Sequence, residues 1–173
     1  FNEQLVRNNS DVPEYRDLLA KCYRQSGKLM LTTGKIDLAT DEHNKAAEIL
    51  EELSVDFPEV PEYRRGLAGE YSALGSLQNT QGQKDLARQY YERALPILER
   101  LVDEFPTNAG YQDNLAANYN NLGLMHRDGG DLDLAQENIL KAVSRWETLA
   151  TAIPNNPVFQ SNIGSGRSNL GLV

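Results

Sequence analysis

Apolar residues recur along this chain at spacings of three and four, within stretches of about twenty residues separated by proline or glycine. The stretch from Pro61 to Thr80 is representative, and its apolar positions are Tyr63, Leu67, Tyr71, Leu74 and Leu77. This spacing places the side chains on one face of a helix, so it predicts an amphipathic α-helix. Pro61 suits the first helical position, because the N–H that proline lacks would be unsatisfied there.

The pattern repeats with a fixed period of 48 residues, the interval from Tyr15 to Tyr63. The aromatic columns that keep this interval are Tyr15, Tyr63, Tyr111 and Phe159, and Tyr23, Tyr71 and Tyr119. Glycine and proline columns keep it too, at Gly27, Gly75, Gly123 and Gly171, and at Pro58, Pro106 and Pro154. A fixed period of this size is typical of a stacked array of repeats.

Each repeat contains the signals of two helices. Gly34, Gly82 and Gly130 are expected to end the first helices, where a positive φ is commonly required. Pro58, Pro106 and Pro154 are expected to stop the second helices. Asn108 and Asn156 are predicted N-caps. The sequence therefore predicts an all-α fold without strands, a right-handed α-solenoid of antiparallel helix pairs with about seven helices and a stub at the amino end.

The predicted organisation is a single array over residues 1–173. Residues 1–11 read as the end of a preceding repeat, and 12–59, 60–107 and 108–155 read as three complete repeats. Residues 156–173 read as the first helix of a fourth. Because both ends fall inside repeats, we expect the sequence to be a piece of a longer protein.

Three repeats carry a recognisable motif, which is weakest in 12–59, where it consists of Tyr23, Gly27, Gly34, Ala39, His43 and Ala46. In 60–107 it consists of Tyr71, Leu74, Gly75, Ala87, Tyr91 and Ala94, and in 108–155 of Tyr119, Leu122, Gly123, Ala135, Ile139 and Ala142. These residues resemble the tetratricopeptide repeat, whose usual length is about 34 residues. The 48-residue period marks a variant with longer helices, similar to the repeat tails of some bacterial serine/threonine kinases. The resemblance implies close helix pairing at the alanines and a buried aromatic column whose tyrosine hydroxyls have partners.

Composition excludes several classes of function. The net charge of −8, from 17 basic and 25 acidic residues, argues against nucleic acid and against an anionic membrane surface. A single cysteine, Cys22, favours a reducing compartment such as the cytoplasm. We expect no catalytic, metal or cofactor site. His43 reads as a packed core residue, His126 lacks a second ligand at metal spacing, and the acidic turn at 128–133 fails the calcium-loop pattern.

The resemblance also implies a groove, lined by the first helices, in which a partner peptide lies. Its predicted residues are Lys21, Arg24, Lys28, Ser72, Ser76, Asn79, Asn120, Leu124 and Arg127. Lys21, Arg24 and Lys28 share one helical face, which suggests either an acidic peptide ligand or only a solvated charge stripe. Replacing all three with glutamate is expected to slow association and leave the fold intact. Gly66 and Gly69 indicate either close helix packing or close approach of a ligand.

The preferred function is a non-catalytic scaffold that binds a protein or an extended, acidic peptide. The alternative is a regulatory segment of a larger enzyme, for example a kinase, that acts through self-association of stacked repeats. Terminal repeats exposed in the excised piece would also favour such association.

Overall fold

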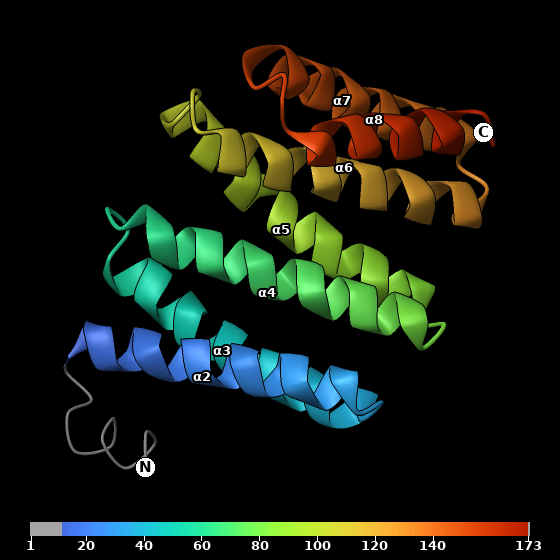
Figure 1. Ribbon diagram of the computed structural model, residues 1–173. Coiled ribbons are helices and arrows are strands. Elements are labelled where there is room, and N and C mark those ends of the chain that lie inside the picture. The colour runs from blue at the N-terminus through green and yellow to red at the C-terminus, as the bar shows by residue number, and fades with distance from the viewer. Residues whose placement is uncertain (1–11, 173) are drawn as a thin grey trace. The chain divides into compact units, whose positions relative to one another are not determined.

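The computed structural model describes residues 12–172, which form seven helices joined by short turns and contain no strand (Figure 1). The helices are α2 (Pro13–Thr32), α3 (Ile36–Asp56), α4 (Pro61–Thr80), α5 (Lys84–Glu104), α6 (Ala109–Gly129), α7 (Leu132–Ala152) and α8 (Pro157–Leu170). The predicted all-α fold is confirmed. The predicted amino-terminal stub lies outside the described residues.

Proline, glycine and asparagine set the helix boundaries as expected. Gly34, Gly82 and Gly130 have φ values of 71°, 78° and 87°, a conformation that residues with a Cβ rarely adopt. The Asn108 Oδ1 accepts a hydrogen bond from the backbone N–H of Tyr111 at 3.1 Å, and the Asn156 Oδ1 accepts one from Val158 at 3.0 Å. Both predicted N-caps are therefore confirmed.

The helices belong to two compact units, each with its own contacts. Unit 1 extends to Gly82 and contains α2, α3 and α4, with α3 packed against both of the others. Unit 2 begins at Gln83 and contains α5 to α8, in which each helix contacts the next one along the chain. The boundary falls inside the predicted repeat 60–107, and the division into repeats stays a prediction.

Small residues allow the helices to approach closely. The column of predicted packing alanines is fully buried, namely Ala39, Ala46, Ala87, Ala94, Ala135 and Ala142. At Gly123 of α6, an added Cβ would lie 2.5 Å from the Ile139 Cγ1 of α7, so only glycine fits. In α4, Gly66 packs against Leu50, whereas Gly69 is exposed with no neighbouring atom within 4 Å of an added Cβ. Close packing thus explains Gly66 and does not explain Gly69.

The second aromatic column is fixed by a repeated hydrogen bond. The Tyr71 hydroxyl donates to the Glu51 carboxylate, and the Tyr119 hydroxyl donates to Glu99 at 2.5 Å. Arg167, which replaces the aromatic residue in this column, donates to Glu147 at 2.7 Å. Each acceptor stands twenty residues before its donor. Burial and the bond to Glu99 raise the pKa of Tyr119 to about 12.

The first aromatic column packs by ring contacts instead. Tyr63 meets Phe57 edge to face with ring centroids 6.2 Å apart, and Tyr111 meets Phe105 at 5.7 Å. Such pairs stabilise a core beyond the area that they bury. Among residues 12–172, no helix is both long and apolar enough to cross a membrane.

Candidate peptide-binding surface

The predicted groove residues lie on helices that the repeat pattern predicts as first helices of a repeat. These are α2 and α4 in unit 1 and α6 in unit 2. On α2 and α4 of unit 1, Lys21, Lys28, Ser76 and Asn79 are exposed, while Arg24 and Ser72 are half-buried. On α6 of unit 2, Asn120, Leu124 and Arg127 are half-buried. In both units most of these side chains are therefore accessible at least in part.

A pocket in unit 1 brings two of these residues together. It has a volume of about 360 Å³ and is lined by Lys28 of α2 and Ser76 of α4. His43 of α3 also lines it, with apolar side chains that include Leu31 and Leu77. A site of this size accepts one side chain of a ligand and offers it a cation, a hydroxyl and an apolar wall.

The basic triad of α2 is largely compensated within the chain. The Lys21 Nζ pairs with the Asp17 Oδ2 at 2.6 Å, and the Arg24 Nε pairs with the carboxylate of Glu70. Within the part of the chain that the structure describes, Lys28 has no carboxylate within 4.0 Å, the limit for an ion pair. Lys28 is therefore the member of the triad best able to attract an acidic ligand.

Arg24 belongs to a buried cluster that we call the Glu70 cluster, formed by Arg24, His43 and Glu70. Glu70 is only 1% exposed, and its second carboxylate oxygen lies 2.7 Å from the Nδ1 of His43. Because a carboxylate only accepts, His43 must donate from Nδ1. His43 is 2% exposed, which confirms the predicted core position. Glu70 was not among the residues predicted from the sequence.

The corresponding junction in unit 2 is uncharged. Asn118 stands one period after Glu70, and Tyr91 stands one period after His43. Asn118 is also 1% exposed, and its Nδ2 donates to the backbone carbonyl of Tyr91 at 3.0 Å. The same place in two helix pairs thus holds an ionic cluster in unit 1 and an amide in unit 2.

The groove residues of α6 also have partners within the chain. The Asn120 Oδ1 accepts a hydrogen bond from the Asn169 Nδ2 at 3.0 Å, and the Arg127 Nη2 lies 3.0 Å from the Asp128 Oδ1. Lys84 also bonds to Asp128, at 2.7 Å. Hydrogen bonds from Lys84 and Arg127 lower the pKa of Asp128.

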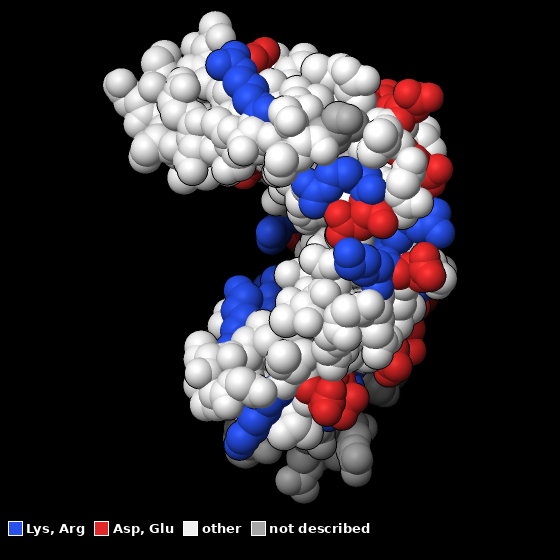
Figure 2. All heavy atoms as spheres, turned by 90° about the vertical axis from the view of Figure 1, so that its right-hand side faces the viewer, with Lys and Arg blue, Asp and Glu red and all other residues white. Residues whose placement is uncertain are grey.

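Charges of both signs lie close together on one face of the molecule (Figure 2). On the face that Figure 2 shows, Lys and Arg side chains lie among Asp and Glu side chains, without a continuous basic surface. His126 lies 3.8 Å from the Asp131 Oδ2. Among the residues described, no three His, Cys, Asp or Glu side chains are grouped so that they could hold a metal ion.

Comparison with known protein families agrees with the motif. The family model of the tetratricopeptide repeat matches residues 71–97 and 116–145. Two segments of the chain therefore match the tetratricopeptide repeat. Repeats of this kind stack helix pairs and present extended surfaces to protein partners. No curated protein matches the chain.

Comparison with solved structures agrees with the fold. The crystal structure of BtubC (BKLC) from P. vanneervenii superposes with a TM-score of 0.60 at 20% sequence identity, over 90% of this chain. This chain spans 58% of the length of that protein. The designed helical repeat protein DHR64 matches with a TM-score of 0.41, at 14% identity over 99% of this chain and 89% of its own. MamA matches with a TM-score of 0.35 at 17% sequence identity, over 84% of this chain and 91% of the MamA chain.

Proposed function

We propose that this chain is a non-catalytic scaffold, built from a long-helix form of the tetratricopeptide repeat, that binds an extended segment of a partner protein along its first helices. The observation that carries the proposal is the pocket of unit 1 lined by Lys28 and Ser76. These two residues come from different first helices, and both belong to the face that the repeat pattern predicts for ligand binding. Unit 2 offers Asn120, Leu124 and Arg127 on α6.

The chemistry of the pocket defines the ligand in unit 1. The ammonium group of Lys28 favours an acidic residue over α2, since opposite charges steer encounter and select partners. Ser72 and Ser76 on α4 favour a neutral segment there, whose backbone groups bond to side-chain hydroxyls. The partner segment is therefore extended, acidic at the end that lies over α2 and uncharged over α4.

The test is a peptide array followed by titration of the best ligands against Lys28→Glu at low and high salt. We expect acidic peptides to be selected, and Lys28→Glu to weaken them several-fold, with a smaller effect at high salt because salt screens exposed charges. Lys45→Glu is the matched control, since Lys45 is exposed on the second helix α3. Selection of basic peptides, or unchanged binding to Lys28→Glu, would overturn the proposal.

Arg24 is not a suitable target for this test. Its guanidinium pairs with Glu70, which is buried, so Arg24→Glu would bring two carboxylates together in the interior. Breaking a buried ion pair in this way destabilises a fold by about 3–5 kcal/mol. The expectation that the triple glutamate variant leaves the fold intact conflicts with this pairing, so Lys28 alone should be changed.

The alternative function is self-association within a larger enzyme, such as a kinase. One observation favours it, because two apolar side chains of the last described repeat, Val158 and Leu172, are 52% and 66% exposed. Size-exclusion chromatography with light scattering distinguishes the two functions. A monomer at micromolar concentration supports the scaffold, and a concentration-dependent increase in mass that is lost in Val158→Ser supports self-association.

A further inference from the structure

Two grooves occupy the same place in two different helix pairs. One lies between α2 and α3 in unit 1 and has a volume of about 750 Å³. The other lies between α6 and α7 in unit 2 and has a volume of about 820 Å³. Four of their lining residues correspond at a separation of two periods, pairing Arg16 with Gln112, Ile49 with Arg145, Glu52 with Thr148 and Asp56 with Ala152. We call them the α2–α3 groove and the α6–α7 groove.

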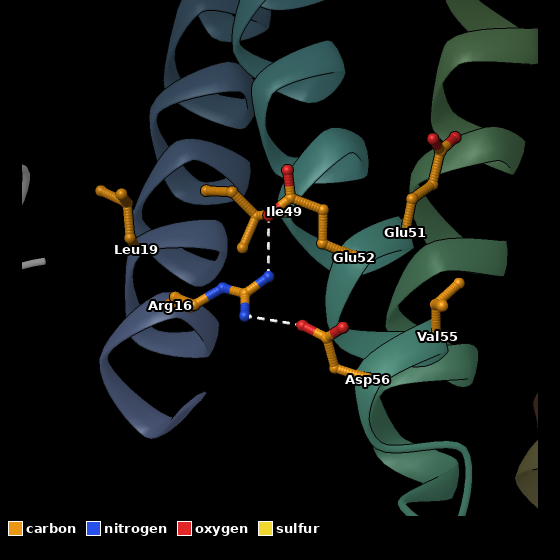
Figure 3. A pocket seen from close by; sticks show the side chains of 7 residues that line it. All are labelled: Arg16, Leu19, Ile49, Glu51, Glu52, Val55 and Asp56. Atoms are coloured by element: carbon orange, nitrogen blue, oxygen red, sulfur yellow. Dashed lines mark hydrogen bonds and ion pairs between the residues drawn. The ribbon is translucent and has the colours of Figure 1, made fainter. Parts of the chain in front are cut away.

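The cation of the α2–α3 groove is neutralised by the groove itself. Arg16 extends from α2 toward α3, where its two terminal nitrogens lie 2.7 Å from the Glu52 Oε2 and 3.0 Å from the Asp56 Oδ2 (Figure 3). The Arg16 side chain is 17% exposed. Two carboxylates thus neutralise the charge of Arg16 and would repel an external anion.

The cation of the α6–α7 groove has no such partner. Thr148 and Ala152 replace the two acids, and none of the residues that line this groove is acidic. The guanidinium of Arg145 donates to the neutral Gln112 Oε1 at 2.6 Å and lies 5.8 Å from the ring centroid of Tyr119. Among the described residues, no carboxylate lies within 4.0 Å of Arg145. Its guanidinium is therefore not paired directly with a carboxylate, on a protein of net charge −8.

Apolar side chains accompany this cation. Leu140 and Ile153 line the groove and are 49% and 41% exposed, so each has surface left to bury. The groove follows α7 from Leu140 to Ala152, a rise of roughly 18 Å at about 1.5 Å per residue. A second cation, Lys141, pairs with Glu137 at 2.7 Å and also lies 5.4 Å from the Tyr119 ring. The groove therefore combines an apolar surface with a guanidinium that has no carboxylate partner.

We propose that the α6–α7 groove is a second binding site, for a partner-protein segment that places a bulky apolar side chain next to a carboxylate. The carboxylate pairs with Arg145, whose planar fork suits bidentate binding, and the apolar side chain covers Leu140 and Ile153. None of the groove's lining residues belongs to the first-helix face described above. The site is therefore independent of the peptide-binding surface under "Proposed function".

The first test uses four labelled nonapeptides that share a glycine–serine background and differ at two central residues. These residues are Leu-Glu, Leu-Gln, Ser-Glu and Ser-Gln, and binding to the whole chain is followed by fluorescence anisotropy. We expect the Leu-Glu peptide to bind about tenfold more tightly than either single replacement, as a charge-assisted contact and a buried leucine each allow. Equal binding of the Leu-Glu and Leu-Gln peptides would overturn the proposal.

The second test changes the groove. Arg145→Gln should reduce Leu-Glu binding to the level of Leu-Gln, while Arg88→Gln, which removes the same charge from α5, should have no effect. Arg145 also bonds to Gln112, so a second variant leaves Arg145 in place. Thr148→Glu with Ala152→Asp restores the acids of the α2–α3 groove at two exposed positions and should abolish binding with an unchanged circular dichroism spectrum. Undiminished binding to this folded double variant would overturn the proposal.

Discussion

At the junction between α3 and α4, unit 1 buries the carboxylate of Glu70 between Arg24 and His43. At the corresponding junction between α5 and α6, unit 2 buries the amide of Asn118, which donates to a backbone carbonyl. A third version occurs between α7 and α8, where Gly166 stands one period after Asn118. A Cβ on Gly166 would lie 2.6 Å from the Val143 Cγ2.

The comparison shows that one position in the repeat can be satisfied by charge, by an amide or by the absence of a side chain. Forming the ionic cluster costs free energy, because three polar groups leave water. Removing one of its members costs more, because the remaining groups stay buried without a partner. Removing the Asn118 amide from the junction of unit 2 loses only one hydrogen bond, the one to the Tyr91 carbonyl. The two units should therefore respond very differently to loss of the buried side chain.

The largest effect is expected from Glu70→Ala. Removal of the carboxylate leaves the Arg24 and His43 donors without their acceptor, so the free energy of unfolding should fall by about 3–5 kcal/mol. Urea titration followed by far-ultraviolet circular dichroism measures the loss. Asn118→Ala is the matched variant in unit 2 and should cost about 1–3 kcal/mol. Equal losses for the two variants would contradict the distinction between the junctions.

An intermediate effect is expected from Gly123→Ala in unit 2. The new methyl group would lie 2.5 Å from the Ile139 Cγ1 and 3.0 Å from the backbone oxygen of Ala135, so α6 and α7 must separate. Overpacking of this kind costs about 1–3 kcal/mol, measured by the same urea titration. A stability equal to that of the unmodified chain would show that the two helices are not in close contact at this position.

Gly69→Ala in unit 1 should have the opposite sign. Gly69 is exposed inside α4, and an added Cβ would meet no atom within 4 Å. Alanine lowers the entropy of the unfolded chain and favours the helix, so stability should rise by about 0.5–1 kcal/mol. A loss of stability in thermal unfolding would mean that Gly69 is packed. If peptide binding also weakens while stability rises, Gly69 provides close approach for the ligand backbone.

The smallest effect is expected from Lys84→Ala, which removes an exposed partner of Asp128. Since the pKa of Asp128 is lowered in the folded state, its contribution is present above its ordinary value of 3.8 and disappears as the pH falls through the lower, folded-state value. The variant should lose at most about 0.5 kcal/mol at pH 7. At a pH below both values the two proteins should unfold at the same urea concentration, and a difference that persists there would contradict this origin.

Helix boundaries were predictable because proline and glycine act locally. The sequence placed α4 at Pro61–Thr80, as the structure does. Proline fixes where a helix begins, and Gly82 supplies the positive φ that the turn after α4 requires. The tyrosine and alanine columns were predictable for a related reason, since a fixed period carries each residue to the same environment.

Pairings between distant residues were harder to predict. Arg24 has the helical spacing of a basic stripe, but its partner Glu70 is far along the chain, and only the packing of α2 and α4 against α3 brings them together. A signal for Glu70 did exist, because it falls three residues after Leu67 and four before Leu74, within the apolar stripe of α4. The two grooves were also missed, although comparing Glu52 and Asp56 with Thr148 and Ala152 shows the change in charge.

The hydrogen bonds from Tyr71, Tyr119 and Arg167 to glutamates twenty residues earlier bear on how such a chain can evolve by gain or loss of whole repeats. Recombination that deletes one full period after α3 would still place a tyrosine twenty residues beyond Glu51. The same event would set His43 opposite Asn118 and leave Arg24 without a carboxylate. At the α3–α4 junction, the tyrosine–glutamate bond therefore tolerates such an exchange, whereas the Glu70 cluster does not. A viable rearrangement must carry α2, α3 and α4 together.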